Sequence, residues 1–369
     1  MRGPAAGTKL AGLVTGRCGT IPCVKTDFVP ALELNAAFYR EVIAHLVGPV
    51  PHAAALLGWG SDVLGYDTPR STDHGWGPRL QVFVADTEVA SVRQSIEAGL
   101  PETFRGWPVR YGWDEADVAS HVEVTTLGDW LQAQLGVDPR AGLSSIDWLT
   151  IPQQRLLGVV RGAVYADPDG ELATVRSLLA WYPHDVWLWM LGSQWKRLAQ
   201  EEPFVGRTAE VGDDLGSHLL AGRLVRDVMC AAFLLSRRYW PYTKWFGTAF
   251  SELPGVGELP AVLRRAVTAD DYPTRESALV EAYEFIAHWH NSLQITVEVE
   301  PRARFFHERP FRVLGADRFA EACRAAISDP VLQQLPLVGS VDQFADSTDV
   351  LSQVTRTRYL REFYEKLAG

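Results

Sequence analysis

The stretch LGWGSDVLGYDTPRSTDHGWGPR, residues 57–79, decides the fold. It joins two short apolar runs that we expect to form neighbouring strands, and it opens with a glycine- and serine-rich turn. Gly60 has no Cβ, so a phosphate group can approach its backbone, and Ser61 adds a hydroxyl donor. Asp73 is expected at the start of the second strand, where a carboxylate can hold a Mg²⁺ ion that bridges phosphate oxygens. The stretch therefore predicts a phosphate-binding turn followed by a metal-binding acid.

The side-chain direction of a second acid, Glu123, can be predicted, because Glu123 lies in the expected strand 121–125. It stands between Val122 and Val124, and because side chains alternate along a strand, it faces away from both valines. We predict that Glu123 joins Asp73 as a catalytic and metal-binding carboxylate. The competing interpretation is an acid on the solvent face of the sheet.

The segment resembles the nucleotidyltransferase superfamily, which has the DNA polymerase beta-like fold. In that superfamily a Gly-Ser turn precedes an acid–apolar–acid pair by about ten residues, and a third acid lies on a later strand. Here Gly60-Ser61 matches the turn, Asp73 the first acid and Glu123 the third. The resemblance implies a nucleoside triphosphate and Mg²⁺ as cofactors.

A closer resemblance is to a bacterial family titled domain of unknown function, DUF4037. Two strings carry it: STDHGWGPR at residues 71–79 and RRYWPYTKWFG at residues 237–247. It covers most of the chain after Asp27. It implies a nucleotidyltransferase-like domain with a mixed sheet, followed by a helical substrate-binding domain.

One position departs from the superfamily pattern. Two residues after Asp73, where the second acid is expected, the chain has Gly75. A single carboxylate holds a metal ion less well, and phosphoryl transfer depends mainly on metal and positioning. Asp62 or Asp67, both in the loop, are the candidates to replace the missing ligand.

The pattern of apolar residues divides the chain into three parts. We expect an N-terminal arm over residues 1–27, an α/β domain over 28–145 and an all-helical domain over 146–369, giving an α+β fold class. The expected strands are 52–57, 80–84, 107–111 and 121–125, and the long helices include 172–199 and 215–239.

Charge and composition narrow the possible partners. The 369 residues include 35 Lys and Arg against 45 Asp and Glu, a net charge of −10, which disfavours nucleic acid polymers and anionic membranes. No apolar run reaches the ~18 residues that span a bilayer. Four dispersed cysteines fit a reducing cytosol. We expect a cytoplasmic protein acting on a small molecule, with 13 tryptophans that fill the core or line a pocket for a flat or sugar-like ligand.

Further ligand-binding candidates come from both halves of the chain. Arg79 can clamp a phosphate in a bidentate manner or pair with a structural carboxylate. Tyr239, Tyr242 and Lys244 follow a long apolar helix, where a tyrosine can stack on a base and a lysine can meet a phosphate. The alternative is that Arg237 and neighbouring cations only satisfy the helix C-terminus.

Three functions are consistent with these residues. The first is a nucleotidyltransferase that moves a nucleoside monophosphate from a Mg²⁺–nucleoside triphosphate to a hydroxyl of an aminoglycoside- or sugar-like molecule. The second is a metal-independent, glycosidase-like hydrolase that uses paired carboxylates as acid and base. The third is a non-catalytic protein that binds a nucleotide or metabolite. Gly75 favours the last two, because a missing metal ligand affects only metal chemistry.

Overall fold

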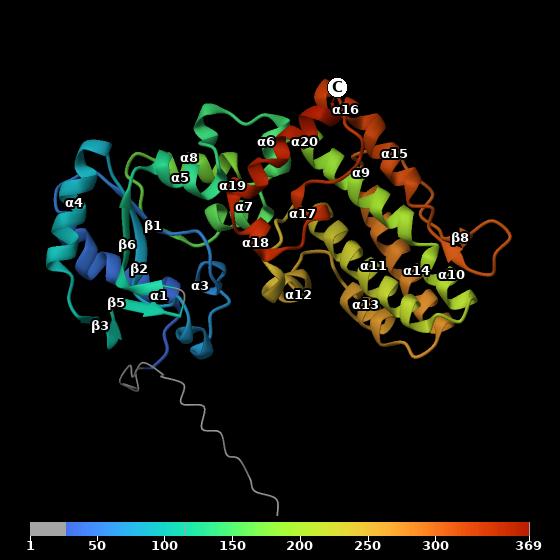
Figure 1. The fold of residues 1–369 in the computed structure, drawn as a ribbon, viewed down its shortest axis with the longest axis horizontal. Coiled ribbons are helices and arrows are strands. Elements are labelled where there is room, and N and C mark those ends of the chain that lie inside the picture. Colours follow the sequence, from blue (N-terminus) through green and yellow to red (C-terminus); the bar gives the residue numbers. More distant parts are fainter. Residues whose placement is uncertain (1–26, 115, 369) are drawn as a thin grey trace, which may run out of the picture.

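The computed structural model describes residues 27–114 and 116–368. Figure 1 shows the sheet at one end of the molecule, the long helices α9 (His184–Glu201), α11 (Asp214–Leu235) and α14 (Tyr272–Ser292) at the other, and α3 and α12 between them. The predicted α+β class, with a mixed sheet and a helical C-terminal region, is confirmed. The expected N-terminal arm lies outside the described residues except for Asp27.

The main sheet has five strands in the order β5-β6-β2-β1-β7. These are β1 (Ala53–Leu56), β2 (Arg79–Phe83), β5 (Arg110–Trp113), β6 (Ala116–Thr125) and β7 (Ala163–Ala166). β2 and β6 are parallel, and the other neighbours are antiparallel. Two small ribbons pair β3 (Thr103–Phe104) with β4 (Trp107–Pro108), and β8 (Arg304–Phe305) with β9 (Arg312–Val313).

Alternation along the strands gives the sheet two different faces. Leu80 and Val122 lie on the face that packs against α1 and α4. On the opposite face Phe83 packs edge-on against Trp130 of α5, with ring centroids 5.6 Å apart. Polar residues share this second face towards the other end of the strands, where Gln81 lies beside Glu123 in register. That polar end of the sheet is where the candidate site forms.

The helices around the sheet are short apart from α4. They are α1 (Ala31–Phe38), η1 (Tyr39–Ile43), α2 (Ala44–Val47), α3 (Ser61–Leu64), η2 (Pro69–Asp73), α4 (Asp86–Gly99), α5 (Leu127–Leu135), η3 (Pro139–Ala141), α6 (Ser145–Thr150), α7 (Gln153–Val160) and α8 (Glu171–Leu178). η1 is a π-helical turn that continues α1 into α2.

The boundary expected at residue 145 does not mark the end of the sheet. β7 comes from Ala163–Ala166 and pairs with β1, so the chain returns to the sheet after α6 and α7. In addition, Arg358 and Arg361 near the C-terminus pair with Asp147 of α6, at 3.2 and 2.6 Å. The two regions therefore interlock instead of following one another.

The remaining helices form the second region. Besides α9, α11 and α14 they are α10 (Phe204–Glu210), α12 (Thr243–Ser251), α13 (Leu259–Thr268), α15 (Asp317–Ala326), α16 (Pro330–Gln334), α17 (Val341–Phe344), α18 (Thr348–Leu351), α19 (Val354–Arg358) and α20 (Leu360–Leu367). The expected helix 172–199 is two helices, because Pro183 starts α9. No helix in the described part of the chain is long and apolar enough to span a membrane.

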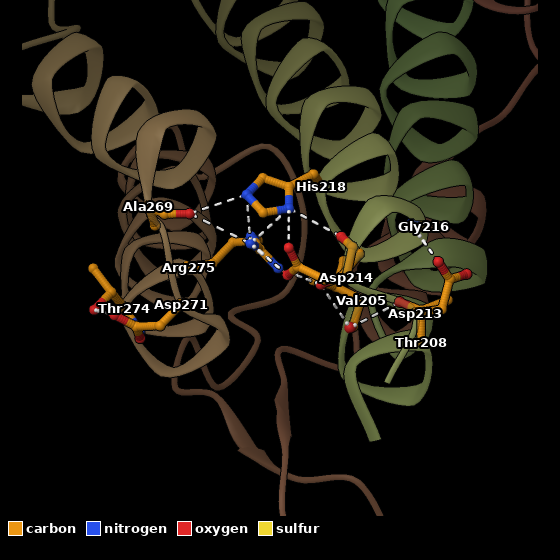
Figure 2. Close-up of polar contacts among 11 residues, drawn as sticks. Val205, Thr208, Asp213, Asp214, Gly216, His218, Ala269, Asp271, Thr274 and Arg275 are labelled. Atoms are coloured by element: carbon orange, nitrogen blue, oxygen red, sulfur yellow. Dashed lines mark hydrogen bonds and ion pairs between the residues drawn. The ribbon is translucent and has the colours of Figure 1, made fainter. Parts of the chain in front are cut away.

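Large buried side chains hold this region together. Trp187, Trp189 and Trp195 of α9 are almost fully buried, so these tryptophans fill the core. Arg275 of α14 is also fully buried and donates to the Ser217 hydroxyl at 2.6 Å, with His218 of α11 against its guanidinium (Figure 2). Such a buried, multiply bonded arginine fixes α14 against α11.

Candidate functional site

A pocket of about 360 Å³ opens at the polar end of the sheet, and we call it the sheet-edge pocket. It is lined by the loop after β1, the loop before β2, strands β2, β5 and β6, and α5. Its lining residues are Leu57, Gly58, Trp59, Gly75, Arg79, Gln81, Tyr111, Trp113, Ser120, His121, Val122, Glu123 and Gln134.

The Arg79 side chain lines this pocket and forms an ion pair with a carboxylate. Its guanidinium binds the Asp62 carboxylate through two hydrogen bonds of 2.8 and 2.9 Å and donates to the Trp59 carbonyl at 2.6 Å. Both charged side chains are less than 10% exposed. Of the two roles predicted for Arg79, the structure contains the ion pair with a structural carboxylate.

The Gly-Ser turn lies beside this ion pair. Gly60 has φ +118°, and a Cβ there would collide with the Asp62 carboxylate, so the turn needs glycine. Ser61 begins α3, and its carbonyl accepts from the Tyr66 N–H at 2.8 Å. Neither Gly60 nor Ser61 belongs to the lining of the sheet-edge pocket.

The two predicted metal ligands are not brought into one cavity. Glu123 lines the sheet-edge pocket, whereas Asp73 is exposed at the end of η2 and lines no part of it. The expectation that Asp73 starts a strand is wrong, because β2 begins only at Arg79. Residues 73 and 75 therefore do not share a strand face.

The Trp59 ring occupies the space that an acidic side chain at position 75 would need. Gly75 lines the pocket with φ +61°, and a Cβ on it would lie 2.8 Å from the Trp59 ring. Any side chain at position 75 would displace this indole and strain the backbone. Glycine at position 75, in place of the second acid, thus leaves room for the Trp59 ring.

The nearby carboxylates do not fit a Mg²⁺ site. Asp62 is held by Arg79, and Asp67 accepts from the Ala31 N–H and the Trp76 indole N–H, both at 2.8 Å. Asp62 is thus not free to replace the missing ligand, and one oxygen of Asp67 is engaged by two donors. Over residues 27–114 and 116–368, no three His, Cys, Asp or Glu side chains gather as a possible metal site.

Two further titratable groups line the pocket, and both have shifted pKa values. Partial burial raises the pKa of Glu123, against the opposing effects of Gln81, Trp130 and Arg79. Burial likewise lowers the pKa of His121, whose Nε2 lies 2.8 Å from the Tyr111 carbonyl. Both shifts are in the direction of the neutral form.

Aromatic rings make up much of the pocket wall. Trp113 packs against Trp59 and His121, with ring centroids 6.1 and 5.2 Å away. The hydroxyl of Tyr111 is buried in the described structure without a hydrogen-bond partner. Burial raises the pKa of this phenol, so it is a neutral donor. Because this hydroxyl has almost no exposed surface, a ligand in the pocket would meet the Tyr111 ring and not its hydroxyl.

A second, larger cavity of about 650 Å³ lies between α3, α7, α8, α11 and α12. We call it the arginine cavity, because Arg161, Arg176, Arg237 and Arg238 line it. Tyr239 also lines it and donates to the Leu179 carbonyl at 3.0 Å. Tyr242 and Lys244 line neither cavity. The Tyr242 hydroxyl accepts from the Trp245 indole N–H at 2.9 Å, and the Lys244 ammonium lies 5.0 Å from the Trp245 ring centre.

Sequence reasoning missed the aromatic pocket wall and most of the arginine cavity. Trp59 and Trp113 gave only the signal of a high tryptophan content. Tyr111 was part of an expected strand, and its buried hydroxyl depends on tertiary packing. Arg161 and Arg176 carried no local signal, because chain folding alone brings them beside Arg237.

Comparison with known proteins identifies part of the chain. Residues 148–246 match the model of DUF4037, a domain of unknown function. The predicted resemblance to DUF4037 is thus confirmed over that stretch, which includes the second diagnostic string up to Phe246 but not residues 71–79. The matched DUF4037 segment contributes most of the arginine cavity.

One solved structure is similar at low identity. A nucleotidyltransferase-like protein from Exiguobacterium sibiricum matches with 13% identity and a TM-score of 0.32, covering 75% of this chain and 83% of that one. The search of curated proteins finds no match.

Proposed function

We propose that this protein binds a small molecule with a flat, uncharged ring, such as a nucleoside, in the sheet-edge pocket. This corresponds to the non-catalytic alternative, a nucleotide- or metabolite-binding protein. The observation that carries the proposal is the aromatic wall of the pocket, where Trp59, Trp113 and Tyr111 lie around one hollow. The pocket volume of about 360 Å³ lies within the range of small-molecule sites.

The side chains in the pocket have complementary roles in this proposal. Trp59 is 49% exposed, so part of its ring is open for stacking on a flat ligand. The Glu123 carboxyl lines the pocket and can donate or accept a hydrogen bond according to its protonation state. Arg79 stays with Asp62 and would support the Trp59 ring, whose centre lies 5.1 Å from its guanidinium carbon.

The catalytic alternatives need groups that the pocket lacks. Nucleotidyl transfer by Mg²⁺ uses paired carboxylates, and metal-independent glycoside hydrolysis uses a second acid opposite the first. Among residues 27–114 and 116–368, Glu123 is the one carboxylate in the lining of the pocket. Ligand binding is therefore the function that these residues support best. Titration with ATP and Mg²⁺ would reveal a nucleotidyltransferase instead.

Calorimetric titration with adenosine and with ATP tests the proposal, each with Mg²⁺ and with EDTA. Binding that persists in EDTA is expected. Trp59→Ala should weaken it roughly tenfold, since stacking of a base on an aromatic ring is worth ~1–3 kcal/mol. Trp289→Ala is the matched control, because Trp289 is also a partly exposed tryptophan but lies outside both cavities. Asp73→Asn should bind like the unaltered protein.

Two results would overturn the proposal. One is no binding of either ligand under any condition. The other is binding of ATP that requires Mg²⁺ and is lost with Asp73→Asn, which would support the nucleotidyltransferase instead.

A further inference from the structure

We propose that the arginine cavity is a binding site for a small phosphorylated molecule that carries at least two negative charges. The cavity shares no lining residue with the sheet-edge pocket, so this inference is independent of the function proposed above. It rests on how many positive charges meet in one hollow, and on how each of them is held.

The charge in the arginine cavity is strongly unbalanced. Four arginines line it, and none lies within 4.0 Å of a carboxylate in the part of the chain that the structure describes. Glu252, the one acid that the described residues contribute to the lining, accepts a 2.6 Å hydrogen bond from the Tyr66 hydroxyl. This concentration of cations occurs in a chain whose net charge is −10.

Two of these arginines have fixed positions. Arg176 donates to the carbonyls of Val160 and Arg161 at the end of α7, both at 2.8 Å. The Arg237 guanidinium carbon lies 4.2 Å from the centre of the Trp187 ring. Because these guanidinium groups are already held, a ligand would lose little freedom of the side chains when it binds.

The backbone of Arg237 adopts an uncommon conformation. Its φ is +52°, at the position after α11 where glycine is usual, and Arg237 and Arg238 donate backbone hydrogen bonds to Leu234 and Phe233. A side chain at this position strains the backbone. Arginine in place of glycine is explained if its guanidinium serves the cavity.

Helix capping accounts for only part of this charge. The C-termini of α7 and α11 each present roughly half a negative charge. Together with Glu252 they offset about half of the four positive charges. A phosphorylated ligand would supply the remaining negative charge, and planar guanidinium groups suit phosphate oxygens. Arg161, Arg237 and Arg238 are exposed, so a ligand can reach them.

Titration of the full chain with inorganic pyrophosphate, followed by calorimetry at low and raised salt, tests this site. We expect binding that weakens as salt screens the charges. Arg238→Gln should weaken it at least about tenfold at low salt. Arg264→Gln is the control, because Arg264 is an exposed arginine of α13 outside both cavities. Thermal unfolding of each variant confirms that it folds.

Arg161→Gln provides a second variant in the lining of the cavity, in case Arg238→Gln does not fold. The proposal is overturned if pyrophosphate does not bind to the unaltered protein. It is equally overturned if the folded cavity variants bind as tightly as Arg264→Gln does.

Discussion

The two cavities use arginine in opposite ways. In the sheet-edge pocket, Arg79 is buried and bonded to both oxygens of Asp62. In the arginine cavity, the exposed Arg238 has no carboxylate within 4.0 Å among the described residues. A buried, paired charge is part of the fold, whereas exposed cations gathered in one hollow are available to a ligand. The difference indicates that the first arginine stabilises and the second binds.

The largest effect is expected from breaking the paired charge. Asp62→Asn leaves Arg79 buried without a counter-charge and should lower the free energy of unfolding by about 3–5 kcal/mol. Urea unfolding measures this. The control is Glu97→Gln, which removes an exposed partner of Arg110 and should change stability by at most about 1 kcal/mol. Equal losses in the two variants would show that Asp62 has no special structural role.

A buried carboxyl group should instead make the stability of the protein depend on pH. Asp342 of α17 is 3% exposed and accepts from the Gln153 N–H at 3.0 Å, and burial raises its pKa to about 7. Its protonated form is favoured in the folded state. The stability it contributes is therefore full below the unfolded pKa of 3.8 and is lost as pH rises through 7.

Asp342→Asn should remove that dependence. Between pH 5 and 8 the unaltered protein should lose about 3 kcal/mol more stability than the variant, at ~1.4 kcal/mol per pH unit below the folded pKa. Urea unfolding across this range measures the difference. Parallel pH profiles would mean that Asp342 is already ionised at pH 5.

A third change tests whether the sheet-edge pocket can be returned to metal binding. Gly75→Asp restores the acid of the superfamily pattern, but its Cβ meets Trp59 at 2.8 Å and its backbone has a positive φ. We expect a loss of about 1–3 kcal/mol and no Mg²⁺ binding by calorimetry. Tight Mg²⁺ binding by this variant would show that only the acid was missing.

Local sequence patterns predicted which side chains share a face of the sheet. They did not predict which charged side chains form ion pairs. Alternation along one strand is enough to place Glu123 opposite Val122, as the structure has it. The Arg79–Asp62 pair depends on how the loop folds over 17 residues, and the bond from the Ala31 N–H to Asp67 spans 36. No periodicity in the sequence records such contacts.

The same limit explains the missed strand and the second cavity. β7 is a four-residue edge strand without clear alternation, and only its pairing with β1 defines it. Arg237 and Arg238 were visible as cations at a helix end. Their meeting with Arg161 depends on the packing of α7 against the end of α11, which spacing along the chain does not encode.

The smallest change in stability is expected for a substitution of Arg237 that should also weaken pyrophosphate binding. Arg237→Gly relieves a left-handed backbone, a gain of about 1 kcal/mol, but loses the contact with Trp187, which is worth ~0.5–1 kcal/mol. Stability should thus stay within about 0.5 kcal/mol while pyrophosphate binding weakens. Gln294→Gly is the matched control, since Gln294 has φ +53° just after α14 and lies outside both cavities. It should stabilise the protein without altering binding. If Arg237→Gly instead gains as much stability as Gln294→Gly and still binds pyrophosphate, then Arg237 serves neither the fold nor the ligand, and the contrast between the two cavities fails at this residue.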